Sequence, residues 1–582
     1  MMTAVHSVPA TESAAGPLPG SGGAGHRAPS GGPGRRRRPG RPFWLLFVPA
    51  AAVVAIYFVV PLAQVVWRSF SDPELGLSNY AALLTDGVTV TVILRTLGVA
   101  LLVTAVTLLL AYPYAYAMTK VGPTGRAVML ALALLPFWTS LLARNFAWLL
   151  LLQDGGPVQS FFAFFGNDQV VLYGSLGGVA VAMSQVLLPY MILPLYSSMQ
   201  SIDRRLLTAG RSLGANPLKA FAKIYFPLSV PGIVAGVLLV FVLSLGFYVT
   251  PALIGSPQQS LIAQLLASRT RELVDFGGAG ALGTVVLVIA MILLLVISRF
   301  GRGAGAVGGA TAVTGGNRRS TLGWPGRVVA TVVGFLLLAP TLVVIPMSFS
   351  AGNTFQFPPK EWSLRWYESF FTSQKWQYAL QNSITIGLLV MLTATVLGTA
   401  AAIFIHRRRG RLASGVNSFL TLPLAVPNIV IAVAIYIVFL QWGLAGTIGG
   451  FVAAHTVLAI PFVLVAVGAS LSGYDRRLGD AAASLGAPGL STFRKITLPL
   501  ILPGVLSGAI FAFVTSFDEV VVALFLKSPR LTTLPALMYD SVTLEIDPTI
   551  GAASSLVVVA TSILIIVPQL IQNHRARKRA AL

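Results

Sequence analysis

The chain has 582 residues, of which 55% are hydrophobic and only 10% are charged. Soluble globular domains carry roughly 25% charged residues, so a chain of this composition and length requires lipid as its solvent. It contains no cysteine, which excludes disulfides, thiolate metal sites and cysteine nucleophiles, and its five histidines are too scattered for a metal cluster. These counts exclude a soluble enzyme. The net charge of +22 must be interpreted by its location, not as a sign of nucleic-acid binding.

The N-terminal segment, residues 1–41, is rich in Gly, Pro, Ser and Ala and has no apolar periodicity, which predicts a disordered tail. Its arginine run, Arg35 to Arg38, lies just before the first apolar segment. That segment is too long for the hydrophobic region of a signal peptide, and no small-residue cleavage site follows it. We therefore expect an uncleaved membrane span behind a basic cytoplasmic anchor.

Apolar segments of about 20 residues predict membrane-spanning helices. The sequence contains twelve, at 43–66, 91–118, 127–152, 174–199, 228–254, 279–299, 328–349, 383–405, 414–441, 446–471, 500–526 and 549–571. A Gly-rich segment divides them into two sets of six. The predicted organisation is a basic tail (1–41), a first unit (42–300), a cytoplasmic linker (301–326), a second unit (327–573) and a basic tail (574–582).

The distribution of charge predicts the orientation. With the N-terminus in the cytoplasm, the cytoplasmic segments hold 30 of the 40 Lys and Arg but only about 4 of the 18 acidic residues. Because cytoplasmic loops carry an excess of basic residues, this asymmetry predicts that both termini and the linker are cytoplasmic.

An internal repeat joins the two sets of spans. Residues 203–236 and 475–508 are related by a constant offset of 272, and 18 of the 34 aligned positions are identical. Each copy lies in a predicted cytoplasmic loop and combines small residues, a glycine and a leucine in a pattern that predicts two short helices around a glycine turn. Such a paired element favours docking to a partner over a helix lying on the lipid headgroups.

These loops resemble the EAA motif of bacterial ABC-importer permeases, E-A-A-x3-G-x9-I-x-L-P. The second copy matches at Asp480, Ala481, Ala482 and Gly486, and continues with Ile496, Leu498 and Pro499. The first copy matches at Thr208, Ala209, Gly210 and Gly214, and continues with Ile224, Phe226 and Pro227. The resemblance implies that both loops, with Leu213 and Leu485, dock to two ATP-hydrolysing subunits. Thr208 replaces the acidic residue, so the two contacts are expected to be unequal.

The ATPase is expected to be a separate protein. A phosphate-binding loop requires a Gly-Lys dipeptide, and the chain has none. We therefore expect no cofactor on this chain, with ATP and magnesium on the partner. The resemblance also implies an extracytoplasmic solute-binding protein.

Further segments resemble the two permeases of spermidine/putrescine importers, joined in one chain. They include 136–156 and 245–255 in the first half and 362–383, 404–412 and 516–526 in the second. Fused permeases also occur in ferric-iron and thiamine importers, so those substrates remain alternatives.

Charged residues within spans are costly and usually functional. Arg144 lies in the third predicted span and Asp518 and Glu519 lie in the eleventh. With Tyr248 they are the candidate residues of the substrate path, since a pair of carboxylates suits a cationic solute. The alternative is a structural pair between Arg144 and one of the carboxylates. At the offset of 272, Glu519 corresponds to Phe247, so the path is less acidic in the first half.

The sequence thus predicts an all-α integral membrane protein with two tandem six-helix units of the type I ABC-importer class. The rival interpretation is a twelve-span secondary transporter, which also consists of two six-helix halves. The paired cytoplasmic loops favour the importer, because a secondary transporter has no partner for them. A membrane enzyme is weaker still, since no constellation of catalytic side chains is present.

Overall fold

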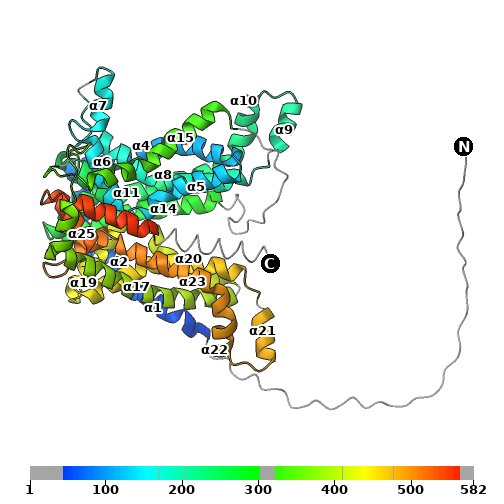
Figure 1. Ribbon diagram of the computed structural model, residues 1–582. Coiled ribbons are helices and arrows are strands. Elements are labelled where there is room, and N and C mark those ends of the chain that lie inside the picture. Colours follow the sequence, from blue (N-terminus) through cyan, green and yellow to red (C-terminus); the bar gives the residue numbers. More distant parts are fainter. Residues whose placement is uncertain are drawn as a thin grey trace, which may run out of the picture. The chain divides into compact units, whose positions relative to one another are not determined.

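The computed structural model describes residues 43–167, 170–203, 205–301, 322–354, 356–408, 410–475 and 477–563. Both predicted tails and most of the predicted linker lie outside these residues. The described parts are helical, and their β-pairing is limited to two isolated bridges, Ser350 with Trp362 and Ser528 with Leu531. From Trp44 onward the helices form one body (Figure 1).

The first half contains helices that match the predicted spans and several short ones between them. They are η1 (Phe43–Leu46), α1 (Val48–Val54), η2 (Ala55–Val59), α2 (Val60–Ser71), α3 (Ser78–Thr85), α4 (Gly87–Lys120), α5 (Pro123–Trp138), α6 (Leu141–Leu152), α7 (Pro157–Phe164), α8 (Leu176–Gln200), α9 (Arg205–Ser212), α10 (Pro217–Ala220), η3 (Phe221–Tyr225), α11 (Phe226–Leu245), α12 (Val249–Ile254), η4 (Pro257–Gln259), α13 (Ile262–Arg271) and α14 (Phe276–Gly301).

The second half repeats this order. Its helices are α15 (Trp324–Met347), α16 (Arg365–Thr372), α17 (Gln374–Arg407), α18 (Arg411–Thr421), η5 (Leu422–Ala425), α19 (Asn428–Gln441), α20 (Ile448–Ser472), α21 (Arg477–Ser484), α22 (Gly489–Thr492), η6 (Phe493–Thr497), α23 (Leu498–Phe517), α24 (Val521–Leu526) and α25 (Leu534–Thr543). A further apolar helix covers Thr549–Ile563. α15 begins at Trp324, three residues before the predicted start of the second unit.

Each of the twelve predicted spans coincides with an apolar helix or helix pair in the described residues. Nine are helices long and apolar enough to cross a membrane, and Thr549–Ile563 is a shorter one. Two of the predicted spans, 127–152 and 414–441, are not single straight helices. Those segments are helix pairs bent by 90° and 96°, broken between α5 and α6 and between η5 and α19. Prolines at or next to these breaks, Pro136 and Pro427, remove backbone donors and disfavour a continuous helix.

The structural repeat extends the sequence repeat over most of each half. α8 and α20, α9 and α21, α11 and α23, and α13 and α25 are each related by an offset of 272. α4 and α17 are related by 287 instead, since they begin at Gly87 and Gln374. The offset changes between these elements because the first half carries the additional helix α7. The two halves are therefore copies of one helical unit.

The first helix of each half packs on the opposite half. α1 and α2 contact α17, α18, α19 and α20, while α15 contacts α4, α5 and α6. Within each half, α4 packs on α8 and α11, and α17 packs on α20 and α23. This exchange of first helices interlocks the halves through apolar surface.

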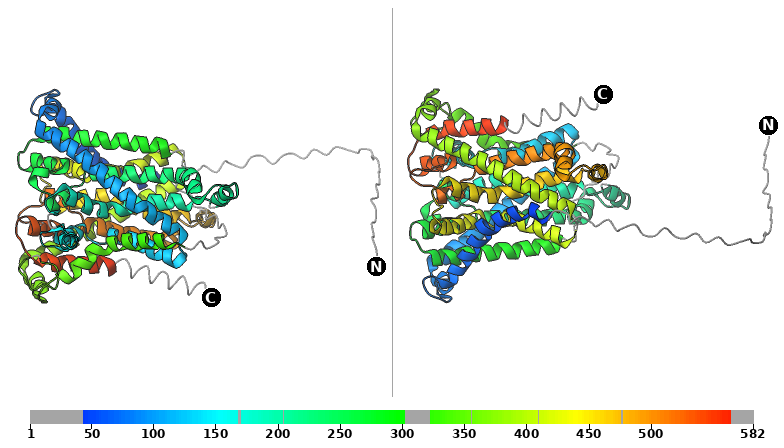
Figure 2. Two further views of the ribbon diagram at one scale, coloured as in Figure 1. Left: turned by 90° about the horizontal axis from the view of Figure 1, so that it is seen from above. Right: turned by 90° about the horizontal axis from the view of Figure 1, so that it is seen from below.

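The repeated short helices lie at one end of the helical body. Figure 1 shows α9, α10, α21 and α22 at one end and α7 and α25 at the opposite end, and Figure 2 shows the same arrangement from above and below. The matching short helices of the two halves therefore lie at the same end of the body.

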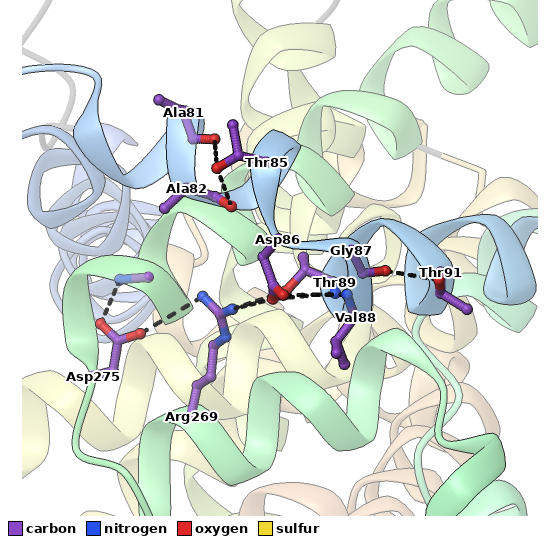
Figure 3. A network of polar contacts seen from close by, with 11 residues as sticks. Ala81, Ala82, Thr85, Asp86, Gly87, Val88, Thr89, Thr91, Arg269 and Asp275 are labelled. Carbon is purple, nitrogen blue, oxygen red and sulfur yellow. Dashed lines mark hydrogen bonds and ion pairs between the residues drawn. The ribbon is translucent and has the colours of Figure 1, made fainter.

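A polar network holds α13 against the start of α4 (Figure 3). The Arg269 guanidinium lies 3.7 Å from Asp86 and 3.6 Å from Asp275, and it donates a 2.9 Å hydrogen bond to the Thr89 hydroxyl. Asp275 in turn accepts from the backbone N–H of Gly278 in the first turn of α14. The Thr89 hydroxyl donates to Asp86, and this bond is the main reason that the pKa of Asp86 is lowered. Arg269 thus fixes the ends of three helices.

The second half makes the same connection with different chemistry. Trp376, which corresponds to Thr89 at the offset of 287, donates its indole N–H to Asp547 at 3.1 Å. Asp547 corresponds to Asp275 and accepts from the backbone N–H of Thr549. An exposed ion pair between Lys375 and Glu545 lies beside this contact. The position of the connection, not its residues, is preserved between the halves.

Candidate functional site

The two repeated loops have the helix–turn–helix geometry that the sequence predicts. α9 and α21 each begin after an aspartate, Asp203 or Asp475, whose carboxylate accepts a 2.9 Å hydrogen bond from the backbone N–H two residues later. Two residues after the end of each helix lies a glycine in the left-handed region, Gly214 with φ of +89° and Gly486 with φ of +82°. Other residues rarely adopt this conformation, which is why glycine ends these helices.

The glycine turns expose one leucine in each loop. Leu213 is 89% exposed and Leu485 is 88% exposed, although large aliphatic side chains are normally buried. Thr208, Ala209, Asp480 and Ala481 are exposed on the preceding helices. Each half thus exposes one large apolar side chain at an equivalent position at the same end of the body.

The other sides of the same helices hold the loops to the body. A Cβ on Gly210 would lie 2.5 Å from Cδ1 of Ile224, so this glycine permits close packing of α9 on η3. Ala482 occupies the equivalent position in α21 and is buried. Glycine and alanine in the predicted motif therefore have a packing role, while the leucines face outward.

The second candidate region lies where helices break at equivalent positions. α11 ends at Leu245 and α12 begins at Val249, while α23 ends at Phe517 and α24 begins at Val521. The prediction that Asp518 and Glu519 lie inside a continuous span is therefore wrong. They lie in the break of the second half, at the positions that Gly246 and Phe247 occupy in the first.

The break of the second half contacts the break between α5 and α6 of the first half. The backbone N–H of Leu141, the first residue of α6, donates a 3.1 Å hydrogen bond to Oδ2 of Asp518. The Ser140 side chain is also hydrogen-bonded to Asp518. The side chain of Ser140 does not cap α6 itself. A carboxylate from the opposite half thus occupies the positive end of the α6 helix dipole.

Arg144 lies one turn into the same helix. Its side chain is 9% exposed and interacts electrostatically with Asp518 and Tyr190. Within the described residues it forms no ion pair of 4.0 Å or less with either carboxylate. Nε of Arg144 and Oδ1 of Asp518 are both buried without a hydrogen-bond partner in the described part of the chain.

The equivalent contact between the other two helix breaks is apolar. Gly246 packs against Pro427, the residue before α19, so closely that a Cβ on the glycine would lie 2.4 Å from Cβ of the proline. At the offset of 287, Ser140 corresponds to Pro427 and Arg144 corresponds to Ile431. At these two pairs of helix breaks the halves therefore meet through a polar contact (Asp518 with Ser140, Leu141 and Arg144) on one side and an apolar contact (Gly246 with Pro427) on the other.

The two remaining candidates have different surroundings. Oε1 of Glu519 accepts a 2.9 Å hydrogen bond from the backbone N–H of Val522 and so caps α24 of its own half. Tyr248 lies in the first-half break and stacks on Tyr539 of α25, with ring centroids 6.2 Å apart and hydroxyl oxygens 3.4 Å apart. Tyr248 thus also bridges the two halves. No group of three or more potential metal ligands occurs among the described residues.

Comparison with known families decides the class. The family described as binding-protein-dependent transport system inner membrane component matches residues 42–302 and 394–580. The chain belongs to this family. It is a multi-pass inner-membrane transport component built from two tandem permease units.

Individual relatives each correspond to about one of these units. The putrescine transport system permease protein PotI of Escherichia coli K12 is 33% identical over 41% of this chain and 88% of its own length. The spermidine/putrescine permease PotC of Haemophilus influenzae is 31% identical over 42% of this chain and 95% of its own length. The corresponding PotB of Salmonella typhimurium is 34% identical over 39% and 80%. The permease chain therefore holds two units where each relative holds one.

The structure adds permease residues that the sequence analysis missed. Ser140 and the N–H of Leu141 complete the polar contact, and Tyr539 partners Tyr248. Asn145 accepts a hydrogen bond from Thr250 and so joins α6 to α12 within the first half. Aligning the two halves would have shown that Gly246 is equivalent to Asp518. Their contact partners, however, follow a different offset and could be identified only from the fold.

Proposed function

We propose that this permease forms the translocation path of an ABC importer for a cationic polyamine such as spermidine or putrescine. The observation that carries the substrate class is the match to permeases named for those substrates, over most of each relative's length. Two carboxylates at the helix break of the second half, Asp518 and Glu519, supply acceptors that suit an ammonium group. With Arg144 and Tyr248 they are the proposed path residues.

The repeated loops are the proposed sites of ATPase coupling. Leu213 and Leu485 project from equivalent glycine turns at the same end of the body, which supports one ATPase subunit on each loop. Asp480 is exposed in the second loop, where the first has Thr208, so an acidic side chain is available at this position to only one subunit. In this proposal the partner subunits bind ATP and magnesium and hydrolyse the ATP, and this chain binds no cofactor.

The proposed orientation has both termini and both loops in the cytoplasm, supported by the excess of Lys and Arg in these segments. A solute-binding protein then docks at the opposite end of the helical body. ATP and the loaded binding protein must each bind the outward-facing state more tightly than the inward-facing one, because a ligand shifts an equilibrium only by its differential affinity.

Uptake of labelled spermidine and putrescine tests the proposal. Uptake is measured in a strain deleted for this gene, with and without the gene restored on a plasmid. Loss of uptake on deletion and its return on restoration are the expected results. Unchanged uptake in the deletion strain would contradict the polyamine assignment, and ferric iron and thiamine would then be tested in the same strains.

A further inference from the structure

The polar contact between the halves has no equivalent at the other break, and its residues change together. Where the second-half break has Asp518 facing Ser140 and Arg144, the first-half break has Gly246 facing Pro427, with Ile431 at the position equivalent to Arg144. Both members of the charged set are thus absent from the same pseudo-equivalent contact. Since a continuous apolar contact suffices to close one side, the charged contact requires a separate explanation.

The charged contact is only partly satisfied. Asp518 uses Oδ2 to cap α6, but Oδ1 is buried without a hydrogen-bond partner in the described residues, as is Nε of the nearby Arg144. A buried carboxylate oxygen without a hydrogen bond carries a desolvation penalty, and a cationic donor that binds it would remove that penalty. The α6 N-terminus carries only about half an elementary charge, so a full ammonium charge is a stronger partner for Asp518.

We propose that Asp518 is a closing contact that the cationic substrate releases. This inference rests on the proposed function, because it requires a cation in the path. In the described conformation the carboxylate holds the N-terminus of α6 against the α23–α24 break. An ammonium group of the substrate replaces the amide of Leu141 as the partner of Asp518, and Arg144 opposes the return of a second cation. Substrate recognition and separation of the two halves then depend on the same carboxylate.

The absence of cysteine from the chain provides a direct test. Thr139 lies in the α5–α6 break and is 3% exposed, so Thr139→Cys is a single reporter that is protected while the contact is closed. Membranes containing the complete importer are treated with a charged, membrane-impermeant maleimide, with and without spermidine. Spermidine uptake is measured in intact cells that express the same variants.

Two substitutions separate the cap from the charge. Asp518→Gly copies the first-half residue and removes the cap, so the reporter should react faster without spermidine by about two- to thirtyfold, the range expected for loss of a helix N-cap. Asp518→Asn keeps an oxygen acceptor for the amide of Leu141 but loses the charge. Its reporter should stay protected and no longer respond to spermidine. Glu545→Gln removes an exposed carboxylate paired with Lys375 and serves as the matched control.

The outcomes distinguish this inference from the proposed function. The inference is supported if spermidine increases the labelling of Thr139→Cys in the chain that keeps Asp518, and if the two Asp518 variants behave as described. If that chain takes up spermidine but the labelling of its Thr139→Cys reporter does not increase, the inference is overturned and the proposed function stands. A native response in Asp518→Asn overturns the exchange of partners in the same way. Absence of spermidine uptake by the native chain overturns the proposed function itself.

Discussion

Replacing Gly246 with alanine should separate the two halves at their apolar contact. The backbone at Gly246 has φ of −99°, which any residue adopts, so the effect of the substitution is steric. The new Cβ would lie 2.4 Å from Cβ of Pro427 and 3.2 Å from its Cα. Carbon atoms pack at about 3.5–4.0 Å, so the two helix breaks must move apart by about 1 Å. Overpacking of this kind destabilises by about 1–3 kcal/mol.

The assay is thermal unfolding of the purified chain in detergent, followed by tryptophan fluorescence, together with substrate uptake in cells. Gly98→Ala is the matched control, because Gly98 lies inside α4 and a Cβ there would meet nothing within 4 Å. That variant should be neutral or stabilised by up to about 1 kcal/mol. We expect a lower melting temperature for Gly246→Ala than for Gly98→Ala. Equal melting temperatures would refute the close approach of Gly246 and Pro427.

Two further predictions concern the loops and the network at α4. Asp480→Arg should weaken co-purification of the ATPase by about tenfold or more while leaving membrane insertion intact. The reason is that a reversed charge at an interface costs several kcal/mol of binding free energy. Thr208→Arg should have the smaller effect, because it reverses no charge. Unimpaired co-purification and transport by the Asp480 variant would remove it from the coupling contact. Because the pKa of Asp86 is lowered in the folded state, chiefly by the Thr89 hydroxyl, its stabilisation is present above the unfolded pKa of about 3.9 and is lost as the pH falls through the folded value. The native chain should therefore melt above Asp86→Asn at pH 7, and the gap should narrow below about pH 4; a gap independent of pH would show that the charge of Asp86 does not stabilise the fold.

Much of the architecture could be predicted because membrane composition imposes simple rules. All twelve apolar segments coincide with helices or helix pairs, since backbone groups in lipid must be satisfied within the segment. Composition alone could not predict the bends at α5–α6 and η5–α19 or the break before α24. A re-entrant helix pair has the same hydrophobicity as a straight span, and only packing decides between them.

The candidate loops were predictable for a local reason. Gly214 and Gly486 occupy left-handed turns, and the identical spacing of the two copies predicts the same helix–turn–helix in both. Local backbone conformation and periodicity depend on neighbours in sequence, so a repeat of 34 residues contains the information needed.

The residues of the proposed substrate path show what the sequence could not predict. The sequence by itself determined that Arg144, Asp518 and Glu519 are unusual, because a charge in an apolar segment requires compensation. Glu519 is compensated locally, by the backbone N–H of Val522 three residues later. Only the tertiary structure decided that the amide of Leu141 compensates Asp518. Asp518 and Leu141 are 377 residues apart, and they meet because the helix breaks of the two halves pack on each other. A hydrogen bond of this kind depends on the relative position of the halves, which no local pattern in either half specifies.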